Sequence, residues 1–360
     1  MERVLSLIVL AAAVFGFVAA AHAGPVGERH LTTTDATAAL RDAEHRPQVR
    51  VTVWYPAAND AAPTRIDIGP PGKPYFLVGA VAPDAAFADS GRRPVILFSH
   101  GFGGAARMMG WFGIPLARAG YVVVAVDHPG NNGLDKMTVA GAIMSWDRAQ
   151  DLQAALEAVK ADPTIGPHLD PARLGVSGFS AGGFTTLVSA GARVDMARFQ
   201  AFCAQHPTDG VCAPQKEFVV TPEDVQRTLA TPEIAAEFAH AGDDHSIPGV
   251  RAAFAIAPAI VQALPPEGLA QIKPPVAIIL GDADPVAPPD TNGLVAAKAI
   301  PNAELRVLPG VGHYDFLSTC TPAGVAAVPL CAAIKVPQDA THQAAIDMAL
   351  AFFGKTLGAP

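Results

Sequence analysis

The sequence predicts an α/β fold in which helices flank an open, mostly parallel β-sheet. Short apolar and β-branched runs recur along the chain, and segments with helical spacing lie between them. Continuous apolar runs of this length are typical of parallel strands that are buried on both faces. The 33 Gly and 33 Pro residues also imply many turns, which argues against a helical bundle.

The strands are expected at the β-branched apolar runs, which are residues 50–55, 95–98, 121–126, 174–178, 252–257, 276–280 and 304–308. The first run alternates in polarity and ends at Pro56, so we place it at an edge of the sheet. A helix is expected at residues 146–161, where apolar residues recur at helical spacing. Residues 60–91 are rich in Pro, Gly and Ala, and we expect an irregular connection there.

Residues 193–249 break this alternation. They contain Thr221-Pro222-Glu223 and Thr231-Pro232-Glu233, in which Thr can cap a helix, Pro begins it and an acid lies in its first turn. We therefore expect one domain, residues 24–360, with a small helical insertion that forms a lid over the site.

Composition predicts a large packed core and a small substrate. Of the 360 residues, 50% are hydrophobic and 16% are charged, which argues against disorder. The formal net charge is −8, and no run of Lys or Arg offers a footprint for nucleic acid. We therefore expect a neutral or apolar small molecule as the partner and no nucleic acid.

The N-terminus has the pattern of a signal peptide, residues 1–23. Arg3 precedes an apolar stretch, and Ala21-His22-Ala23 fits the small-x-small cleavage rule. An uncleaved membrane anchor is the alternative, because the stretch is just long enough to span a bilayer. We expect cleavage after Ala23, a periplasmic or secreted protein, and no stable membrane insertion afterwards.

The four cysteines fit an oxidising compartment. Cys203, Cys212, Cys320 and Cys331 are even in number and follow a signal peptide, which indicates two disulfides. Three pairings are possible, and proximity favours Cys203–Cys212 with Cys320–Cys331. A zinc site is the rival interpretation, but the chain has no C-x-x-C pair. We expect no metal.

The segment Gly178-Phe179-Ser180-Ala181-Gly182 has the G-x-S-x-G pattern. It follows an expected strand and precedes a run compatible with a helix, which is the strand–turn–helix context of a nucleophilic serine. Glycines on both sides permit the sharp turn, and the N-terminus of the helix favours developing negative charge. Ser180 is therefore the predicted nucleophile.

A serine hydroxyl needs a base, and the base needs an orienting carboxylate. His313 follows the last expected strand in a Gly-rich loop, whereas the rival histidines lie in the insertion (His206, His245) or the C-terminal helical segment (His342). Asp284 and Asp282 both follow the strand at residues 276–280. We prefer Asp284, because Asp282 could instead cap that turn through its own backbone. The resulting order Ser180, Asp284, His313 differs from the chymotrypsin and subtilisin orders.

An oxyanion intermediate needs two backbone N–H donors. Ala181, next to the nucleophile, supplies one. The loop Ser99-His100-Gly101-Phe102-Gly103-Gly104 supplies the other, and we assign it to Phe102. His100, Asp127-His128-Pro129-Gly130 and the group Trp146, Arg148 and Asp151 are interpreted as structural.

These residues resemble a known family. Residues 94–104 (PVILFSHGFGG), 121–131 (YVVVAVDHPGN), 178–183 (GFSAGG) and 312–316 (GHYDF) are similar to bacterial predicted dienelactone hydrolases and, within the α/β-hydrolase superfamily, to platelet-activating-factor acetylhydrolase-like serine esterases. The resemblance implies an α/β-hydrolase fold, with Ser180, Asp284 and His313 as the triad and Phe102 and Ala181 as oxyanion donors. Dienelactone hydrolases carry a Cys nucleophile, so that label does not transfer literally.

We therefore expect hydrolysis of carboxyl esters with short acyl groups, through an acyl-enzyme and without a cofactor. Amide or peptide cleavage and acyl transfer to an alcohol are alternatives on the same triad. A binding protein without turnover is a further alternative, because a fold does not by itself imply an activity. The sequence does not indicate the oligomeric state.

Overall fold

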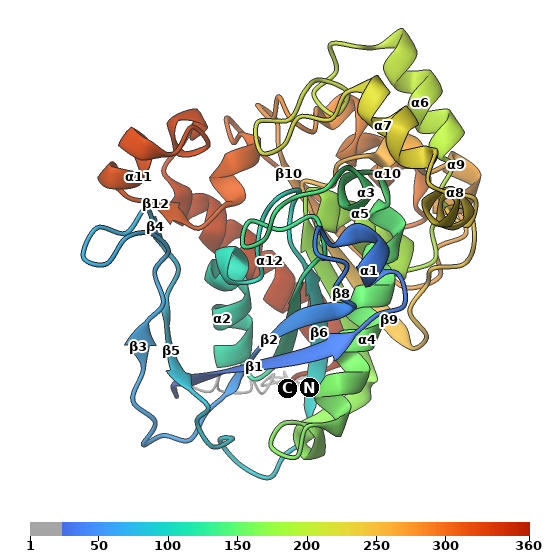
Figure 1. Ribbon diagram of the computed structural model, residues 1–360. Helices are drawn as coiled ribbons and strands as arrows, with labels where there is room; N and C mark the ends of the chain where they lie inside the picture. Colours follow the sequence, from blue (N-terminus) through green and yellow to red (C-terminus); the bar gives the residue numbers. More distant parts are fainter. Residues whose placement is uncertain (1–23) are drawn as a thin grey trace, which may run out of the picture.

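The computed structural model describes residues 24–360, so the signal-peptide prediction lies outside the described residues. Its centre is a ten-stranded sheet in the order β11-β10-β9-β8-β6-β7-β2-β1-β5-β3 (Figure 1). The bounds of these strands are β1 Val26–Thr34, β2 Gln48–Pro56, β3 Thr64–Arg65, β5 Ala80–Pro83, β6 Arg93–Ser99, β7 Val122–Asp127, β8 Leu169–Phe179, β9 Val250–Ile256, β10 Val276–Gly281 and β11 Glu304–Leu308. Strands β4 (Phe76–Leu77) and β12 (Thr319–Cys320) form a separate pair.

The strands from β7 to β11 run parallel, whereas β2 is antiparallel to its neighbours β7 and β1. The mostly parallel α/β sheet is confirmed. The edge position expected for residues 50–55 is wrong, because β2 lies between β7 and β1. Pro56 is the last residue of β2, so its missing N–H falls at the end of the ladder with β1, opposite Val26.

Two further elements differ from expectation. Strand β1 was not expected from the sequence, and it alternates half-buried and exposed residues from Arg29 to Thr34. Residues 60–91 are less irregular than expected, since β3, β4 and β5 lie there and β5 pairs with β1. These strands are only two to four residues long, too short to show a period.

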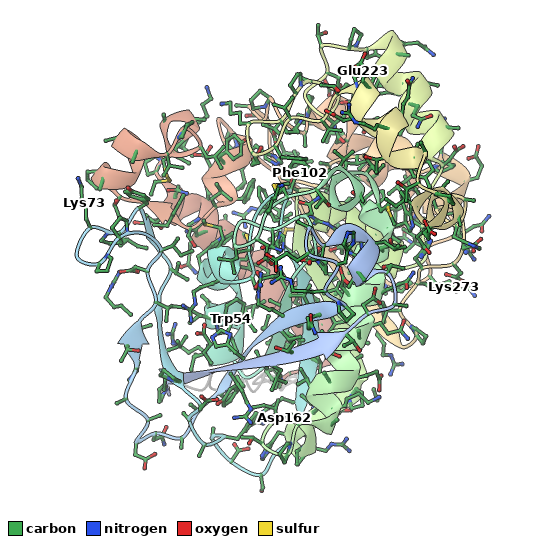
Figure 2. The ribbon with its side chains drawn as sticks, viewed as in Figure 1. Trp54, Lys73, Phe102, Asp162, Glu223 and Lys273 are labelled. Atoms are coloured by element: carbon green, nitrogen blue, oxygen red, sulfur yellow. A yellow bond between two sulfur atoms is a disulfide. The ribbon has the colours of Figure 1, made fainter. Side chains whose placement is uncertain are left out.

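Helices cover both faces of the sheet (Figure 1). Helices α2 (Gly110–Arg118) and α12 (Gln338–Leu357) lie on one face, where Trp54, Phe112 and Phe352 form the core. Trp54 lies between β2 and α2, and a Cβ at Gly113 would come within 2.4 Å of its ring (Figure 2). Helices α4 (Arg148–Ala161), α5 (Ala181–Ser189) and α10 (Gly293–Ala299) cover the other face, around Leu152 and Phe184.

Four further helices are short, with bounds α1 Ala38–Arg41, α3 Val139–Ile143, α9 Pro266–Leu269 and α11 Pro322–Ala327. The helix expected at residues 146–161 is present as α4, after a 3-10 turn at Ser145–Asp147. No helix within residues 24–360 has both the length and the apolar character needed to span a bilayer.

The segment between α5 and β9 contains three helices, α6 (Met196–Gln205), α7 (Pro222–Leu229) and α8 (Pro232–Phe238), which form one group in Figure 1. Thr221 caps α7 by accepting from the N–H of Asp224, whose carboxylate accepts from the Thr221 N–H in return. Thr231 precedes α8 without a side-chain bond. Disulfides join Cys203 to Cys212 and Cys320 to Cys331, at S–S distances of 2.00 and 2.05 Å.

Candidate active site

Ser180 occupies the turn between β8 and α5. Its backbone has φ +58° and ψ −117°, a conformation that is unfavourable for a residue with a side chain. The glycines on either side make the turn possible. A Cβ at Gly182 would lie 1.9 Å from the Ser99 carbonyl oxygen, and a Cβ at Gly178 would lie 2.2 Å from the Gly182 carbonyl oxygen. The turn is therefore held by close backbone packing that only glycine permits.

The structure brings Ser180, His313 and Asp284 into one hydrogen-bonded chain. His313 Nε2 lies 2.8 Å from Ser180 Oγ, and His313 Nδ1 lies 2.6 Å from Asp284 Oδ2. All three residues are buried, with 6%, 3% and 5% of their surface exposed. An ionised Asp284 can only accept, so Nδ1 carries the proton and the Nε2 lone pair is free to accept from the Ser180 hydroxyl.

Asp284 is held from behind by the loop that follows β10. Its Oδ1 accepts hydrogen bonds from the backbone N–H groups of Val286 and Ala287, both at 2.8 Å. Asp282, the rival carboxylate, instead accepts from the Gly310 N–H at 2.6 Å, in the loop before His313. The two acids therefore have separate contacts, and only Asp284 touches the imidazole.

The rival histidines lie in other surroundings. The His245 ring contacts the His240 carbonyl oxygen at 2.9 Å, and the His342 ring contacts the Leu317 carbonyl oxygen at 2.8 Å. His206 is exposed beside the Phe202 ring. None of the three contacts Ser180 among the described residues.

Two backbone N–H groups near Ser180 lack protein acceptors. Ala181 is the first residue of α5, so its N–H has no acceptor within the helix. Phe102, in the loop after β6, has a backbone N–H with no hydrogen bond to any residue in 24–360. This loop lies next to Ser180, since a Cβ at Gly101 would be 3.4 Å from the Ser180 Cβ. The arrangement provides two donors that an oxyanion could use.

Residues of the insertion reach the loops of this site. Tyr314, next to His313, donates from its hydroxyl to Glu217 Oε1 at 3.1 Å. The Glu217 Cβ would lie 2.9 Å from a Cβ at Gly103, in the same loop as Phe102. Thr291 donates to Asp209 Oδ2 at 2.8 Å. The insertion therefore contacts the loop that carries Phe102, the segment that carries His313 and the turn before α10.

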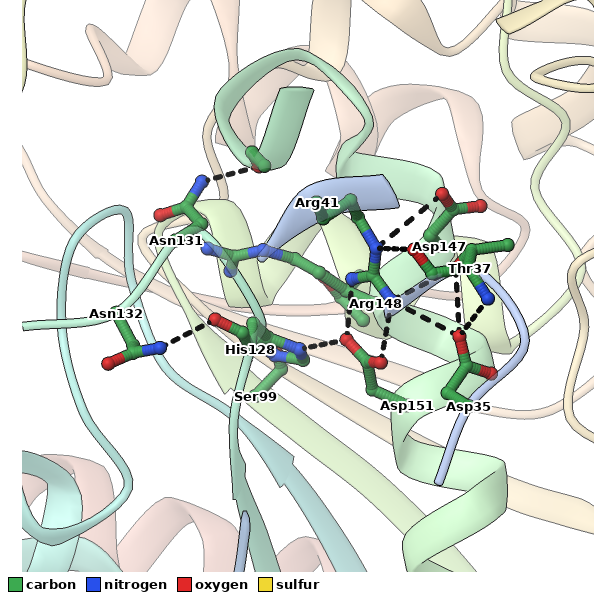
Figure 3. Close-up of polar contacts among 12 residues, drawn as sticks. Asp35, Thr37, Arg41, Ser99, His128, Asn131, Asn132, Asp147, Arg148 and Asp151 are labelled. Atoms are coloured by element: carbon green, nitrogen blue, oxygen red, sulfur yellow. Dashed lines mark hydrogen bonds and ion pairs between the residues drawn. The ribbon is translucent and has the colours of Figure 1, made fainter. Parts of the chain in front are cut away.

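Behind the loop that carries Phe102 lies a buried polar cluster that sequence patterns did not reveal. Figure 3 shows His128, Asp151, Arg41 and Arg148 converging from separate elements. His128 and Asp151 are 23 residues apart, and Asp151 and Arg41 are 110 apart, so no local motif joins them. Within residues 24–360, no group of His, Cys, Asp and Glu has the arrangement of a metal site.

Residues 95–328 match the family model described as "Alpha/beta hydrolase family". The chain therefore belongs to the α/β hydrolase family. A ferulic acid esterase from Streptomyces cinnamoneus has a similar structure, with a TM-score of 0.58 and 20% sequence identity over 92% of this chain and 90% of that chain. Among curated proteins, none matches this chain in sequence.

Proposed function

We propose that this protein is a serine hydrolase that cleaves carboxyl esters, with Ser180 as nucleophile, His313 as base and Asp284 as the orienting acid. The observation that carries the proposal is the continuous hydrogen-bonded chain from Asp284 through His313 to Ser180, at a strained turn beside two unpaired N–H groups. The ester substrate of the structurally similar ferulic acid esterase agrees with this choice of chemistry.

In the proposed reaction, Ser180 Oγ attacks the ester carbonyl carbon while His313 Nε2 takes the hydroxyl proton. The C=O electrons move to oxygen, and the N–H groups of Phe102 and Ala181 stabilise the oxyanion. His313 then donates the proton to the leaving alkoxide, and an acyl-enzyme remains. Water, activated by His313, releases the acid. Asp284 stabilises the imidazolium that forms twice in this cycle. No cofactor is needed.

We propose short acyl groups as the preferred substrates. Several apolar side chains that were candidates for an acyl pocket are committed to the core instead. The Phe112 ring packs on Phe98 and Phe254 with centroids 5.5 and 5.9 Å away, and the Trp111 ring stacks on His342 at 4.0 Å. Met109 and Phe179 are buried in the same core, and of these candidates only Phe102 and Met108 stay partly exposed, which leaves little apolar surface for a long chain.

The test is turnover of p-nitrophenyl esters from acetate to palmitate by the mature protein and by Ser180→Ala. We expect kcat/KM to be highest for acyl groups of about two to four carbons. Ser180→Ala should lower kcat by about 10³-fold or more and leave the melting temperature unchanged. Fluorophosphonate labelling of the wild type but not of Ser180→Ala would support the nucleophile. Retained turnover in the variant would refute it, and a maximum at palmitate would refute the short-acyl preference.

We also propose that residues 193–249 act as a lid and that the protein is periplasmic or secreted. The contacts of Glu217 with Tyr314 and of Asp209 with Thr291 support the lid. The two disulfides are compatible with an oxidising compartment. The finer relationship to dienelactone hydrolases and platelet-activating-factor acetylhydrolases rests on the resemblance of the motifs alone.

A further inference from the structure

The loop from Ser99 to Gly104 is fixed on both sides of Phe102. The Gly103 N–H donates to Asn131 Oδ1 at 2.8 Å, and the Gly104 carbonyl oxygen accepts from the Gly133 N–H at 2.7 Å. On the other side, the His100 carbonyl oxygen accepts from Arg148 Nη1 at 2.8 Å. Phe102 itself forms no hydrogen bond within residues 24–360, so its neighbours determine where its N–H points.

The first residue of this loop begins a second Ser–His–Asp chain. Ser99 Oγ lies 2.8 Å from His128 Nε2, and His128 Nδ1 lies 2.8 Å from Asp151 Oδ2. Ser99, His128 and Asp151 are each 0% exposed. No substrate can reach a hydroxyl that is closed off in this way, so the chain is not a second catalytic triad.

The charges around His128 fix its protons. Burial, together with the positive charges of Arg148 and Arg41, holds the pKa of His128 well below its usual range, so the ring is neutral. Its Nδ1–H donates to Asp151, and its Nε2 accepts from the Ser99 hydroxyl. Arg41 donates to both Asp151 oxygens at 2.8 Å (Figure 3), and its positive charge balances that of the carboxylate. The direction of every bond in the chain is therefore determined.

We propose that this buried cluster, in which Arg41 and Asp151 orient His128 toward Ser99 and Arg148 holds the His100 carbonyl, positions the Phe102 N–H to receive the oxyanion. Ser99, His128, Asp151 and Arg148 are then positioning residues of the hydrolase. Asp151 and Arg148 both lie on α4, so this helix sets the placement of a loop that it does not itself belong to. The inference rests on the proposed function, because it assigns the loop's purpose to oxyanion stabilisation.

Comparing an oxygen ester with a thiono ester distinguishes a role in oxyanion stabilisation from a role in stability alone, because a loss of stability would slow both esters equally. Attack on C=S places the negative charge on sulfur, which accepts hydrogen bonds more weakly and lies further from the carbon than oxygen does. A misaligned Phe102 N–H should therefore slow the oxygen ester more than the thiono ester. The experiment measures kcat/KM for p-nitrophenyl acetate and for its thionocarbonyl analogue, in wild type and in Ser99→Ala.

We expect Ser99→Ala to lower kcat on the oxygen ester by about 10-fold, less than the 100- to 1000-fold loss typical of a deleted oxyanion donor, with KM little changed. The ester ratio, which is kcat/KM for the oxygen ester divided by kcat/KM for the thiono ester, should fall by a similar factor. Ser177→Ala is the matched control. The Ser177 hydroxyl is equally buried and donates to the Phe254 carbonyl oxygen at 2.8 Å, but it has no bond to the loop. Its ester ratio should equal that of wild type.

Two substitutions of His128 repeat the test if Ser99→Ala does not fold. His128→Gln can retain an acceptor for Ser99 and loses the bond to Asp151, whereas His128→Asn can retain the donor to Asp151 and loses Ser99. A lowered ester ratio in either soluble variant supports the proposal. Equal losses on both esters, unchanged rates, or a lowered ratio in Ser177→Ala would overturn it.

The outcome can be separated from failure of the proposed function. Absence of turnover in the wild type, or turnover that survives Ser180→Ala, would reject the hydrolase itself. If the wild type is active, Ser180→Ala is inactive and the ester ratio does not respond to Ser99 or His128, then the hydrolase stands and only the positioning role is rejected.

Discussion

At the residue scale, the orientation of the His313 imidazole depends on one oxygen of Asp284. Asp284→Asn would retain an oxygen for the N–H groups of Val286 and Ala287, but its amide could no longer stabilise an imidazolium or select the same tautomer. We expect kcat to fall by about 10⁴-fold, with KM and melting temperature nearly unchanged. Steady-state kinetics on p-nitrophenyl acetate measure this.

Asp282→Asn is the matched control for that substitution. Asp282 lies two residues away and contacts the Gly310 N–H instead of the imidazole. We expect a loss of less than about 10-fold, because its contacts shape a turn and do not reach the reacting atoms. If the two variants lost activity equally, the preference for Asp284 as the orienting acid would be wrong.

The same scale shows what sequence could and could not supply. Ser180 lies in a contiguous motif, and Asp284 and His313 each follow a recognisable strand, so a rule about chain order can find them. His128, Asp151 and Arg41 come from three separate elements and meet only in the folded protein. Burial and pairing of such distant charges leave no periodic pattern, and Asp151 reads like any acid in the first turn of a helix.

At the element scale, the junction of β8 and α5 tolerates no side chain at Gly182. Gly182→Ala would place its Cβ 1.9 Å from the Ser99 carbonyl oxygen and must displace β6 or α5. We expect destabilisation of about 3 kcal/mol or more and loss of activity. Thermal or urea unfolding measures the change in the free energy of unfolding.

Gly354→Ala in α12 is the contrasting variant. A Cβ there meets no atom within 4 Å, and alanine favours a helix over glycine. We expect stabilisation of about 0.5–1 kcal/mol and normal turnover. Equal responses at the two positions would mean that helical propensity, and not the close approach of backbones, governs Gly182.

A second prediction at this scale concerns the insertion. Burial and the Glu217 carboxylate raise the pKa of Tyr314, so its hydroxyl stays protonated and donates to Glu217. Tyr314→Phe would leave Glu217 without this partner and should release the segment from the site. We expect about 5-fold faster proteolysis within residues 193–249, since a lost hydrogen bond to a charged group is worth about 1.5–3 kcal/mol when shielded and less near the surface.

Tyr75→Phe serves as the control for the insertion, because no hydrogen bond of the Tyr75 hydroxyl occurs in the part of the chain that the structure describes. Cleavage of that variant at wild-type speed is expected. Unaltered proteolysis in Tyr314→Phe would count against the lid. The insertion and its position over the site were expected from the sequence, but the particular contacts of Glu217 and Asp209 could not be anticipated, since they depend on how the loops meet in space.

Elements differ in how well sequence predicted them, for a physical reason. The strands β6, β7 and β10 and the C-terminal parts of β8 and β9 are buried on both faces and therefore consist mainly of apolar runs. Strand β1 exposes every second residue over much of its length and contains Glu, Arg and His, so no apolar run marks it. The position of β2 inside the sheet depends on β1, which explains why its edge assignment failed.

At the scale of the whole molecule, buried neutral histidines make stability sensitive to acid. Burial lowers the pKa of His342 to about 4, and its ring lies against Trp111 and the Leu317 carbonyl oxygen. In the unfolded chain this ring takes up a proton near pH 6.5. The contribution of the neutral His342 ring to the free energy of unfolding is therefore complete above pH 6.5. It is lost as the pH falls toward 4, by about 1.4 kcal/mol per pH unit.

His342→Gln removes this titration and should make the unfolding free energy less dependent on pH between about 4 and 6.5, by one proton's worth. Urea unfolding at a series of pH values measures the slope. A wild-type slope in His342→Gln would mean that the ring becomes protonated without unfolding.

Each disulfide spans only a short stretch of chain, with sequence separations of 9 and 11 residues, and neither crosses the ten-stranded sheet. Each disulfide therefore restricts only the residues between its two cysteines, 203–212 and 320–331. Neither ties together the strands of the sheet or the helices on its two faces. We therefore expect the sheet, the turn at Ser180 and the loop before His313 to form even while all four cysteines are reduced. Maturation by oxidation would tighten an already assembled hydrolase instead of creating one.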